Sequence, residues 1–317
     1  MITDEHLTPA AIRAAHGQLP AVFRDAPQYE HDGLSALLGA PVIVKVETVN
    51  PIRSFKGRGT WIAVHALAGE GRISPTRPVV CCSAGNFGQG VAYAARSLGI
   101  PAIVFCSTRA NRGKVARMRG LGAEVIESGD DFDAARGASE AYAADHDAEL
   151  LVDGDDVRIS TGAGTLAVEL TDGVARGALP APAVIAVPVG NGALLNGVGS
   201  WLRAESPGTR ILGIQAELAD AMTRSWHAGH PVDTDSAATY ADGIASRVAI
   251  PRAVELMTGR VDEMLTLSED DLHGAQATLT EHLGITVEGA AAASWAGVLA
   301  GPRPDGPAVV IVTGSNA

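Results

Sequence analysis

Short runs of consecutive apolar residues alternate along the chain with longer stretches in which apolar residues recur every three or four positions. Runs of four to six apolar residues are typical of strands buried on both faces of a parallel sheet, and the longer stretches are typical of the helices that cover it. The predicted strands are 42–46, 79–82, 102–105, 124–126, 183–188, 210–215 and 308–312. The predicted helices are 57–68, 87–98, 114–121, 132–144, 164–173 and 194–203. This order predicts an α/β protein with two doubly wound parallel-sheet domains, each a three-layer α/β/α unit.

The alternation runs in two series, which predicts two domains with a cleft between them. We expect residues 77–153 to form a small α/β domain, and residues 1–76 and 154–317 to form a large one. The region from the strand at 210–215 to about Gly284 is expected to contain helices and loops only. Ligands of such sheets bind beyond the carboxyl ends of the strands, so the turns there are the candidate sites.

Composition and charge exclude some classes of protein. Hydrophobic residues make up 46% of the chain and charged residues 19%, which is typical of a globular protein. The 36 acidic and 24 basic residues give a net charge of −12, which disfavours a nucleic-acid or anionic-membrane partner. The three cysteines lie in apolar runs and suggest buried thiols in a reducing compartment. No apolar run approaches the about 20 residues of a membrane span and the N-terminus lacks the pattern of a signal peptide, so we expect a cytoplasmic protein.

The turn 53–59, Arg-Ser-Phe-Lys-Gly-Arg-Gly, joins the first predicted strand to the first long helix. Its lysine, Lys56, lies near backbone amides and the positive end of that helix. This environment disfavours an ammonium ion and eases the use of the amine as a neutral nucleophile. We therefore predict that Lys56 is the reactive amine of the site.

Two further turns offer backbone amides at the start of a helix. Residues 83–90, Ser-Ala-Gly-Asn-Phe-Gly-Gln-Gly, suit a carboxylate, and Asn86 adds a neutral donor for a ring oxygen or an imine. Residues 188–194, Pro-Val-Gly-Asn-Gly-Ala-Leu, are small enough for the amides to close on a phosphate. This second turn lacks the lysine of a nucleotide P-loop, which favours a phosphate monoester over a triphosphate.

The remaining motifs are weaker. Thr313 follows strand 308–312 and places a hydroxyl where it can bond a ring nitrogen. The loose dinucleotide pattern at 162–167 follows a poor strand, and no acid for a ribose ends the next strand, so a nicotinamide cofactor is disfavoured. No histidine or cysteine cluster has the spacing of metal ligands, and we interpret Glu217 as part of a solvated acidic turn, so no metal site is predicted.

Together these motifs resemble the serine/threonine dehydratase family of pyridoxal-phosphate enzymes, the branch that contains serine racemase. The resemblance covers nearly the whole chain, through the motifs at 45–47, 54–59, 83–90, 162–165 with Glu169, 188–192, 241–244, 287–291 and 313–316. It implies a tryptophan synthase beta-like fold with pyridoxal 5'-phosphate in the cleft between the two domains. It also implies a homodimer that acts on a small amino acid.

The resemblance assigns roles to the predicted site. Lys56 would carry the cofactor covalently and act as the catalytic group. The cofactor-binding residues would be Phe55 beside the ring, Lys56, Asn86 at the ring hydroxyl, Gly190, Asn191, Gly192, Ala193 and Leu194 at the phosphate, and Thr313 at the ring nitrogen. The residues on the substrate side would be Arg53, Ser83, Ala84, Gly85, Asn86 and Phe87.

The implied reaction is β-elimination of water from threonine, serine or a hydroxyaspartate-like amino acid, giving a 2-oxo acid and ammonia. A hydroxyl at the ring nitrogen does not hold the pyridine protonated, which suits elimination better than chemistry that needs a long-lived carbanion. A β- or γ-replacement synthase of the cysteine synthase or threonine synthase type is an alternative. A protein that binds pyridoxal phosphate without turnover is another. We expect no C-terminal regulatory domain.

The chain departs from the family pattern at several positions. Arg53 replaces the usual glycine, and could select a substrate with a second anionic group or simply pair with an acid. Ala84 stands where racemising members carry a second serine, so little racemisation is expected. Phe87 replaces a common histidine, and Asn191 and Ala193 interrupt the usual glycine run. At the family's metal position Thr223 stands where an acid is expected.

Overall fold

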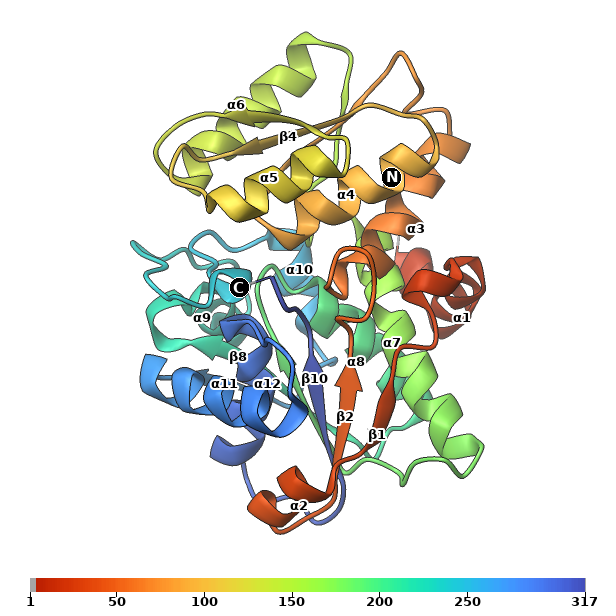
Figure 1. Cartoon of the computed structure of the whole chain (residues 1–317), viewed down its shortest axis with the longest axis vertical. Helices are drawn as coiled ribbons and strands as arrows, with labels where there is room; N and C mark the ends of the chain where they lie inside the picture. The colour runs from red at the N-terminus through yellow and green to blue at the C-terminus, as the bar shows by residue number, and fades with distance from the viewer. Residues whose placement is uncertain (1–3, 317) are drawn as a thin grey trace.

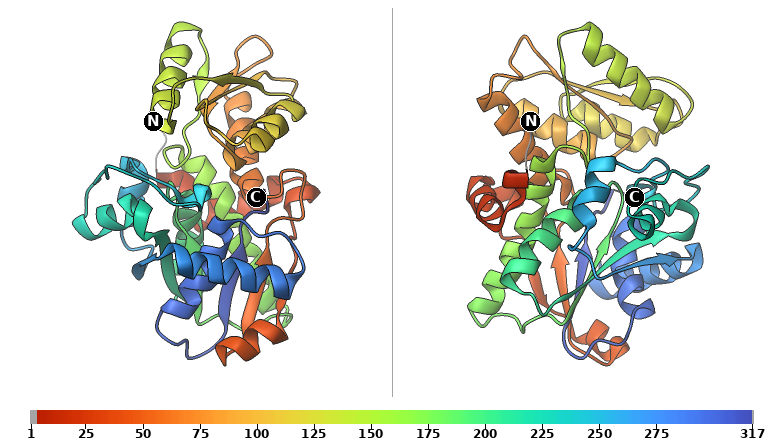
Figure 2. Two further views of the ribbon diagram at one scale, coloured as in Figure 1. Left: turned by 60° about the vertical axis from the view of Figure 1, so that its left-hand side comes forward. Right: turned by 180° about the vertical axis from the view of Figure 1, so that it is seen from behind.

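Two β-sheets organise the computed structural model, which describes residues 4–316 (Figure 1). The strand order of the larger sheet is β1 (Gln28–Glu30), β2 (Val42–Val46), β10 (Ala308–Val312), β7 (Val184–Pro188), β8 (Arg210–Ala216) and β9 (Glu263–Leu267). That of the smaller sheet is β5 (Glu124–Glu127), β4 (Ala102–Cys106), β3 (Val79–Cys82) and β6 (Glu149–Leu150). The two sheets belong to separate layered units, one above the other in every view (Figure 2).

Helices cover both faces of each sheet. Around the larger sheet lie α1 (Pro9–Gln18), α2 (Asp32–Leu38), α7 (Val157–Ala175), α8 (Ala193–Glu205), α9 (Ala221–Ala228), α10 (Pro251–Met257), α11 (Glu269–Leu283) and α12 (Gly289–Ala300). The smaller sheet is packed by α4 (Asn86–Ser97), α5 (Arg112–Gly120) and α6 (Phe132–Asp145), and α3 (Lys56–Gly69) packs on both α4 and α7. Among the described residues, no helix combines the length and apolar character that crossing a membrane requires.

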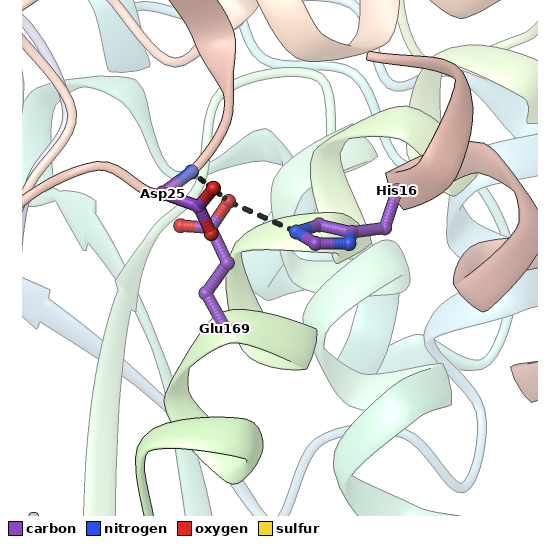
Figure 3. A group of neighbouring side chains, drawn as sticks. All are labelled: His16, Asp25 and Glu169. Carbon is purple, nitrogen blue, oxygen red and sulfur yellow. Dashed lines mark hydrogen bonds and ion pairs between the residues drawn. The ribbon is translucent and has the colours of Figure 1, made fainter. Parts of the chain in front are cut away.

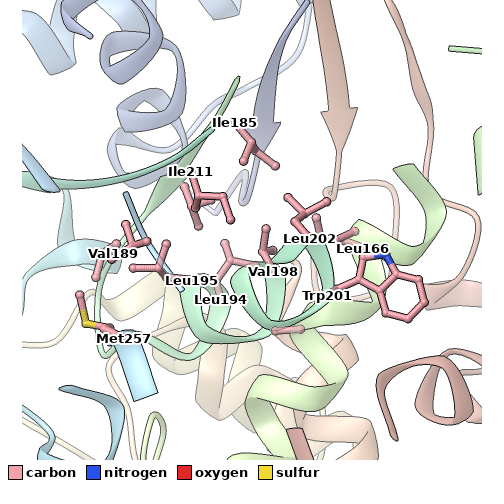
Figure 4. Packing of buried hydrophobic residues seen from close by; sticks show 14 of the residues in the cluster. Leu166, Ile185, Val189, Leu194, Leu195, Val198, Trp201, Leu202, Ile211 and Met257 are labelled. Atoms are coloured by element: carbon pink, nitrogen blue, oxygen red, sulfur yellow. The ribbon is translucent and has the colours of Figure 1, made fainter. Parts of the chain in front are cut away.

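The core of the larger unit follows from the two-residue period of its strands. In β10, Val309 and Ile311 pack against α7 and α8, while Val310 and Val312 face α12 on the opposite side of the sheet. Figure 4 shows the first of these layers. Burying an aliphatic side chain of this size contributes about 1.5–3 kcal/mol, so both faces of the central strands are strongly held. Continuous apolar runs such as 308–312 therefore identify these strands correctly.

The structure confirms the predicted α/β class and the seven predicted strands, and it adds three. β1 pairs antiparallel with β2, so the larger sheet is not wholly parallel. β1 is an exposed polar edge strand, β6 has only two residues, and β9 has mixed burial, so none of them carries a continuous apolar signal. The expectation of helices and loops alone from 216 to 284 was wrong at β9.

Helix α7 is much longer than the predicted 164–173, and residues 157–159 form its first turn rather than a poor strand. Asp156 caps this helix by accepting a hydrogen bond from the backbone of Arg158. Its glycines permit helix crossings: a Cβ at Gly162 would lie 2.6 Å from the carbonyl oxygen of Arg58, and one at Gly164 would lie 2.7 Å from that of Gly197. The dinucleotide-like pattern is therefore a packing motif inside a helix.

Candidate active site

Four turns meet at the carboxyl ends of the strands, between the two units. Lys56 begins α3 after β2, the Ser83 turn links β3 to α4, the Gly190 turn links β7 to α8, and Thr313 directly follows β10. The Phe55 amide donates a hydrogen bond of 3.0 Å to the Thr313 carbonyl, which joins the first turn to the last. The structure thus brings all the predicted turns to one region. The role predicted for each residue there stays a prediction.

The Lys56 side chain points into this region and is only 15% exposed. Its Nζ donates a hydrogen bond of 2.6 Å to Oδ2 of Asp153. It also lies 5.0 Å from the centre of the Phe55 ring and 5.9 Å from that of Phe87. The two aromatic rings and the carboxylate fix the position of the amine. Sequence reasoning missed Asp153, whose only signal was an acid directly after the apolar pair Leu151-Val152.

The Gly190 turn is shaped to receive a small anion. A Cβ at Gly190 would lie 2.7 Å from the Gly243 carbonyl oxygen, and Gly192 adopts a left-handed φ of +86°. Helix α8 begins directly after this glycine, and no side chain of the described residues caps it. Asn191 does not interrupt the amides, because its side chain donates to Asp153 at 3.4 Å and accepts from the Ser246 hydroxyl at 3.1 Å. Backbone amides and the positive end of a 13-residue helix therefore face the turn, and a phosphate group fits there.

The Ser83 turn is held by its own hydroxyl. Oγ of Ser83 accepts from the amides of Gly85 at 3.1 Å and Gly88 at 2.9 Å. The methyl group of Ala84 carries no exchangeable proton. Of the amides predicted to take a substrate carboxylate, that of Gly85 is therefore already engaged within the turn.

Asn86 links this turn to the C-terminal segment. Its Oδ1 accepts from the Asn316 side chain at 2.8 Å, and its Nδ2 donates to Oε2 of Glu288 at 3.0 Å. Burial raises the pKa of the Glu288 carboxyl, although the charge of Lys114 and the hydrogen bonds from Asn316 and Asn86 oppose the shift. Glu288 precedes α12, and sequence reasoning noted its motif without giving it a role. Asn86 is thus oriented by two neighbours on different elements.

Arg53 lies at the edge of the site in an unusual conformation. Its φ of +52° falls in the left-handed region that favours glycine, and its side chain is exposed. Backbone bonds hold it there, because its amide donates to Asn50 at 3.0 Å and its carbonyl accepts from Ser315 at 3.1 Å. Burial and the nearby charge of Arg53 lower the pKa of Arg117 on α5. Two guanidinium groups therefore lie close enough to repel one another.

A buried network of charges supports α3 from below. Arg58 donates to both carboxylate oxygens of Glu47, at 2.7 and 2.9 Å, and to both of Glu169, also at 2.7 and 2.9 Å. Lys45 forms a further ion pair with Glu169. Although burial alone raises the pKa of Glu169, the neighbouring His16, Arg58 and Lys45 outweigh it and hold this pKa well below the usual range. Arg58 lies only two residues after Lys56, so the network anchors the reactive turn.

In the described part of the chain, His16, Asp25 and Glu169 gather with the spacing of metal ligands (Figure 3). Glu169 is not free to ligate a cation. Its oxygens already accept from Lys45, Arg58 and the backbone amides of Asp25 and Ala26. This group is therefore an anchor for the turn at Asp25. At the family's metal position, Glu217 is exposed and the Thr223 hydroxyl donates to Gln215 at 3.0 Å.

Comparison with known proteins follows from this geometry. A family model described as "pyridoxal-phosphate dependent enzyme" matches residues 21–314. The L-threonine ammonia-lyase of Thermotoga maritima is 33% identical over 284 residues, which cover 89% of this chain and 69% of that protein. The biosynthetic L-threonine dehydratase of Mycobacterium leprae is 34% identical over 311 residues, which cover 96% of this chain and 71% of that one.

Solved structures give the same picture. A bacterial structure described as T.th. threonine deaminase superimposes with a TM-score of 0.89 and 30% identity, covering 98% of both chains. Maize serine racemase also gives a TM-score of 0.89, with 26% identity over 98% of this chain and 94% of that one. The likeness therefore extends over both layered units.

Proposed function

Because this chain belongs to the family of pyridoxal-phosphate dependent enzymes, we propose that it is a dehydratase that removes water from small β-hydroxy L-amino acids. The products are a 2-oxo acid and ammonia. The observation that carries the proposal is the position of Lys56, whose amine is enclosed by two aromatic rings at the junction of the four turns. The relatives named threonine ammonia-lyase and threonine dehydratase support threonine and serine as first candidates.

In this proposal the phosphate of the cofactor is held by the amides of the Gly190 turn, and the ring lies beside Phe55. Asn86 bonds the ring hydroxyl, and Thr313, which is 4% exposed, faces the ring nitrogen with a neutral hydroxyl. Bound pyridoxal phosphate draws electrons from the substrate Cα and weakens the Cα–H bond there. The Lys56 amine removes this proton, and the substrate hydroxyl leaves from Cβ. Free amides of the Ser83 turn hold the substrate carboxylate.

A release assay tests the function. The purified protein is supplied with pyridoxal phosphate and with threonine, serine or either diastereomer of 3-hydroxyaspartate, and 2-oxo acid and ammonia are measured. We expect both products from at least one substrate without any added nucleophile. Ammonia that appears only when a nucleophile is added would favour the replacement synthase. A complete absence of 2-oxo acid would favour a binding protein without turnover.

The Lys56→Ala variant supplies the control for the covalent link. It should lose the visible absorbance of the lysine-bound cofactor, whereas wild-type protein should show it. A variant that keeps this absorbance would contradict the assignment of Lys56.

We further propose that the protein is a cytoplasmic homodimer. Cys81, Cys82 and Cys106 are all free thiols, which supports a reducing compartment. Burial raises the pKa of Cys82 to about 12, so this thiol stays protonated and unreactive at neutral pH. The dimer rests on the resemblance to the family, and sedimentation of the purified protein tests it.

A further inference from the structure

Asp153 is an acid at the reactive amine that the assignment of site residues leaves without a role. It lies just beyond β6, the last strand of the smaller sheet, and reaches Lys56 at the start of α3. Its Oδ2 accepts the 2.6 Å hydrogen bond from Nζ of Lys56 and a weaker one of 3.4 Å from the Asn191 side chain. The carboxylate therefore lies between the amine and the turn suited to a phosphate.

Half of this carboxylate has no partner within the described residues. Oδ1 of Asp153 is buried and makes no hydrogen bond there, and the side chain as a whole is 11% exposed. A buried carboxylate oxygen without a donor is costly, because it has lost its water without replacement. When Lys56 engages other atoms, the ion pair is lost as well. Asp153 then needs either a proton or a donor from a bound molecule.

The position of Asp153 is fixed by backbone packing. The next residue, Gly154, has a left-handed φ of +88°, and a Cβ there would lie 2.4 Å from the carbonyl oxygen of Asn191. Only glycine permits this approach, so the Asp153 turn is pressed against the Gly190 turn. A carboxylate held this firmly cannot move away from the amine without moving both turns.

We propose that Asp153 is a second proton-transfer residue, which takes the proton of Lys56 and delivers it to the leaving group of the substrate. This inference rests on the proposed dehydratase function. Lys56 ammonium and Asp153 carboxylate first become a neutral amine and a carboxylic acid. The amine then takes the Cα proton, the electrons of the Cα–H bond form the Cα=Cβ bond, and the Cβ–O bond breaks. Asp153 gives its proton to the departing hydroxide, so water leaves and the ammonium–carboxylate pair is restored.

The choice of leaving group separates this role from a merely structural one. A hydroxide needs a proton to leave as water, whereas the chloride of β-chloro-L-alanine leaves without one. In the loaded enzyme, Asp153→Asn should lower turnover of the β-hydroxy substrate by about 100-fold or more, the usual contribution of an acid–base group. Turnover of β-chloro-L-alanine should change far less. An equal loss for both substrates would overturn the proposal.

A second measurement does not depend on turnover. In the full chain without cofactor, the Asp153 carboxylate favours the ammonium form of Lys56, which does not react with acylating reagents. Asp153→Asn should therefore label Lys56 about tenfold faster at pH 7, measured by mass spectrometry of the Lys56 peptide. An unchanged rate would show that the ion pair does not control the amine, and would overturn the proposal even if the wild-type enzyme is inactive on every amino acid tested.

Asp155→Asn is the matched control, because Asp155 is an exposed acid in the same turn. It should change neither the leaving-group ratio nor the labelling rate. Circular dichroism of each variant confirms folding, and Asp153→Glu gives a second variant that keeps the carboxylate. Asp153→Glu should recover part of the β-hydroxy turnover that Asp153→Asn loses, and failure to recover any would count against proton transfer.

Discussion

Arg53 shows how one residue can be strained and still be retained beside a site. A non-glycine residue in the left-handed region costs of order 1–2 kcal/mol, and this cost is tolerated where neighbours fix the backbone. Asn50 and Ser315 provide that fixation. The result is an exposed guanidinium at the edge of the site, within the electrostatic reach of Arg117. Two unbalanced positive charges there favour a substrate with a second anionic group.

Arg53→Gly tests this at the level of one side chain. The turnover of 3-hydroxyaspartate relative to threonine should fall about tenfold, because one charge–charge contact in a partly exposed site contributes on the order of 1 kcal/mol. Relative kcat/KM values from the release assay measure it. Arg109→Gly, which removes a cation that is 76% exposed elsewhere in the smaller unit, is the control. A ratio that stays the same in Arg53→Gly would reject the selective role.

Ala84 determines a second expectation at the residue scale. Its methyl group cannot deliver a proton to the face of the substrate opposite Lys56, so the wild-type protein should form little D-serine from L-serine. Ala84→Ser restores a hydroxyl and should raise racemisation relative to 2-oxo acid release. Chiral chromatography of the serine pool measures both. Substantial D-serine from the wild-type protein would contradict this reading of the turn.

At the scale of elements, α3 is positioned by its crossing with α7 and by the charges buried beneath it. Neither feature has a clear signal in the sequence. The glycines of α7 look like a ligand loop until their distances to Arg58 and Gly197 are known. The partners of Glu169 lie far from it along the chain, so only the fold brings Lys45 and Arg58 to it. Both features place the first residue of α3, which is Lys56.

Gly162→Ala probes the helix crossing. The new methyl group would lie 2.6 Å from a backbone oxygen of α3, so the helices must separate. We expect a loss of about 1–3 kcal/mol in the free energy of unfolding and a fall in turnover, because α3 carries Lys56. Gly137→Ala in α6 is the matched control, since its methyl group meets open space. It should raise stability by up to about 1 kcal/mol, the gain in helix propensity.

Glu169→Gln probes the buried charges. The pKa of Glu169 is depressed in the folded state, so its contribution to stability is present above the ordinary value of 4.5 and is lost as the pH falls below it. At pH 7 the variant should lose about 3–5 kcal/mol, because Arg58 and Lys45 lose a buried counter-charge. The difference from wild type should shrink as the pH is lowered from 5 towards 3. Urea unfolding at several pH values measures it.

Asp172→Asn, on the same helix, is the control for this comparison. Its ion pair with Arg13 is partly exposed, with side chains 30% and 47% accessible. Exposed pairs contribute at most about 1 kcal/mol, so this variant should change stability little. If Asp172→Asn and Glu169→Gln were equally destabilising, the central place given to the Glu169 network would be wrong.

At the scale of the whole molecule, two ion pairs join the helices of the smaller unit to one segment of the larger. Lys114 on α5 pairs with Asp242, and Asp133 on α6 pairs with Arg247. The Lys114 side chain also lies against the Ser83 turn, 3.4 Å from where a Cβ of Gly85 would be. Closure of the two units around a ligand therefore involves opposite charges across the gap.

Asp133→Asn tests this contact at a distance from the reactive amine. Losing one half-exposed pair costs up to about 1 kcal/mol, so KM for the substrate should rise about two- to fivefold while kcat changes less. The wild-type KM should rise with salt, and that of the variant should rise less, since salt screens charges. Asp131→Asn is unsuitable as a control because Asp131 caps α6, whereas the exposed Asp145 at its other end serves. An unchanged KM in Asp133→Asn would exclude this role.

The sequence alone predicted most of this architecture because apolar runs such as 308–312 are buried on both faces. It failed where a polar edge strand, a two-residue strand or a helix crossing leaves no such pattern. It found Lys56 and the turns through local motifs, since each motif is one turn and its helix. It missed Asp153 because the contact with Lys56 joins residues 97 positions apart. Long-range pairing of this kind is a property of the fold.

The position of β10 has a consequence for how the protein is made. β10 is the last strand in the chain, yet it lies between β2 and β7 in the middle of the larger sheet. During synthesis the ribosome releases β2 and β7 long before β10 can join them, so two strand edges stay open in the meantime. Such edges pair readily with other chains, which makes the nascent protein prone to aggregation. Since Thr313 follows β10, the nascent chain completes its active site only after nearly all of it has left the ribosome.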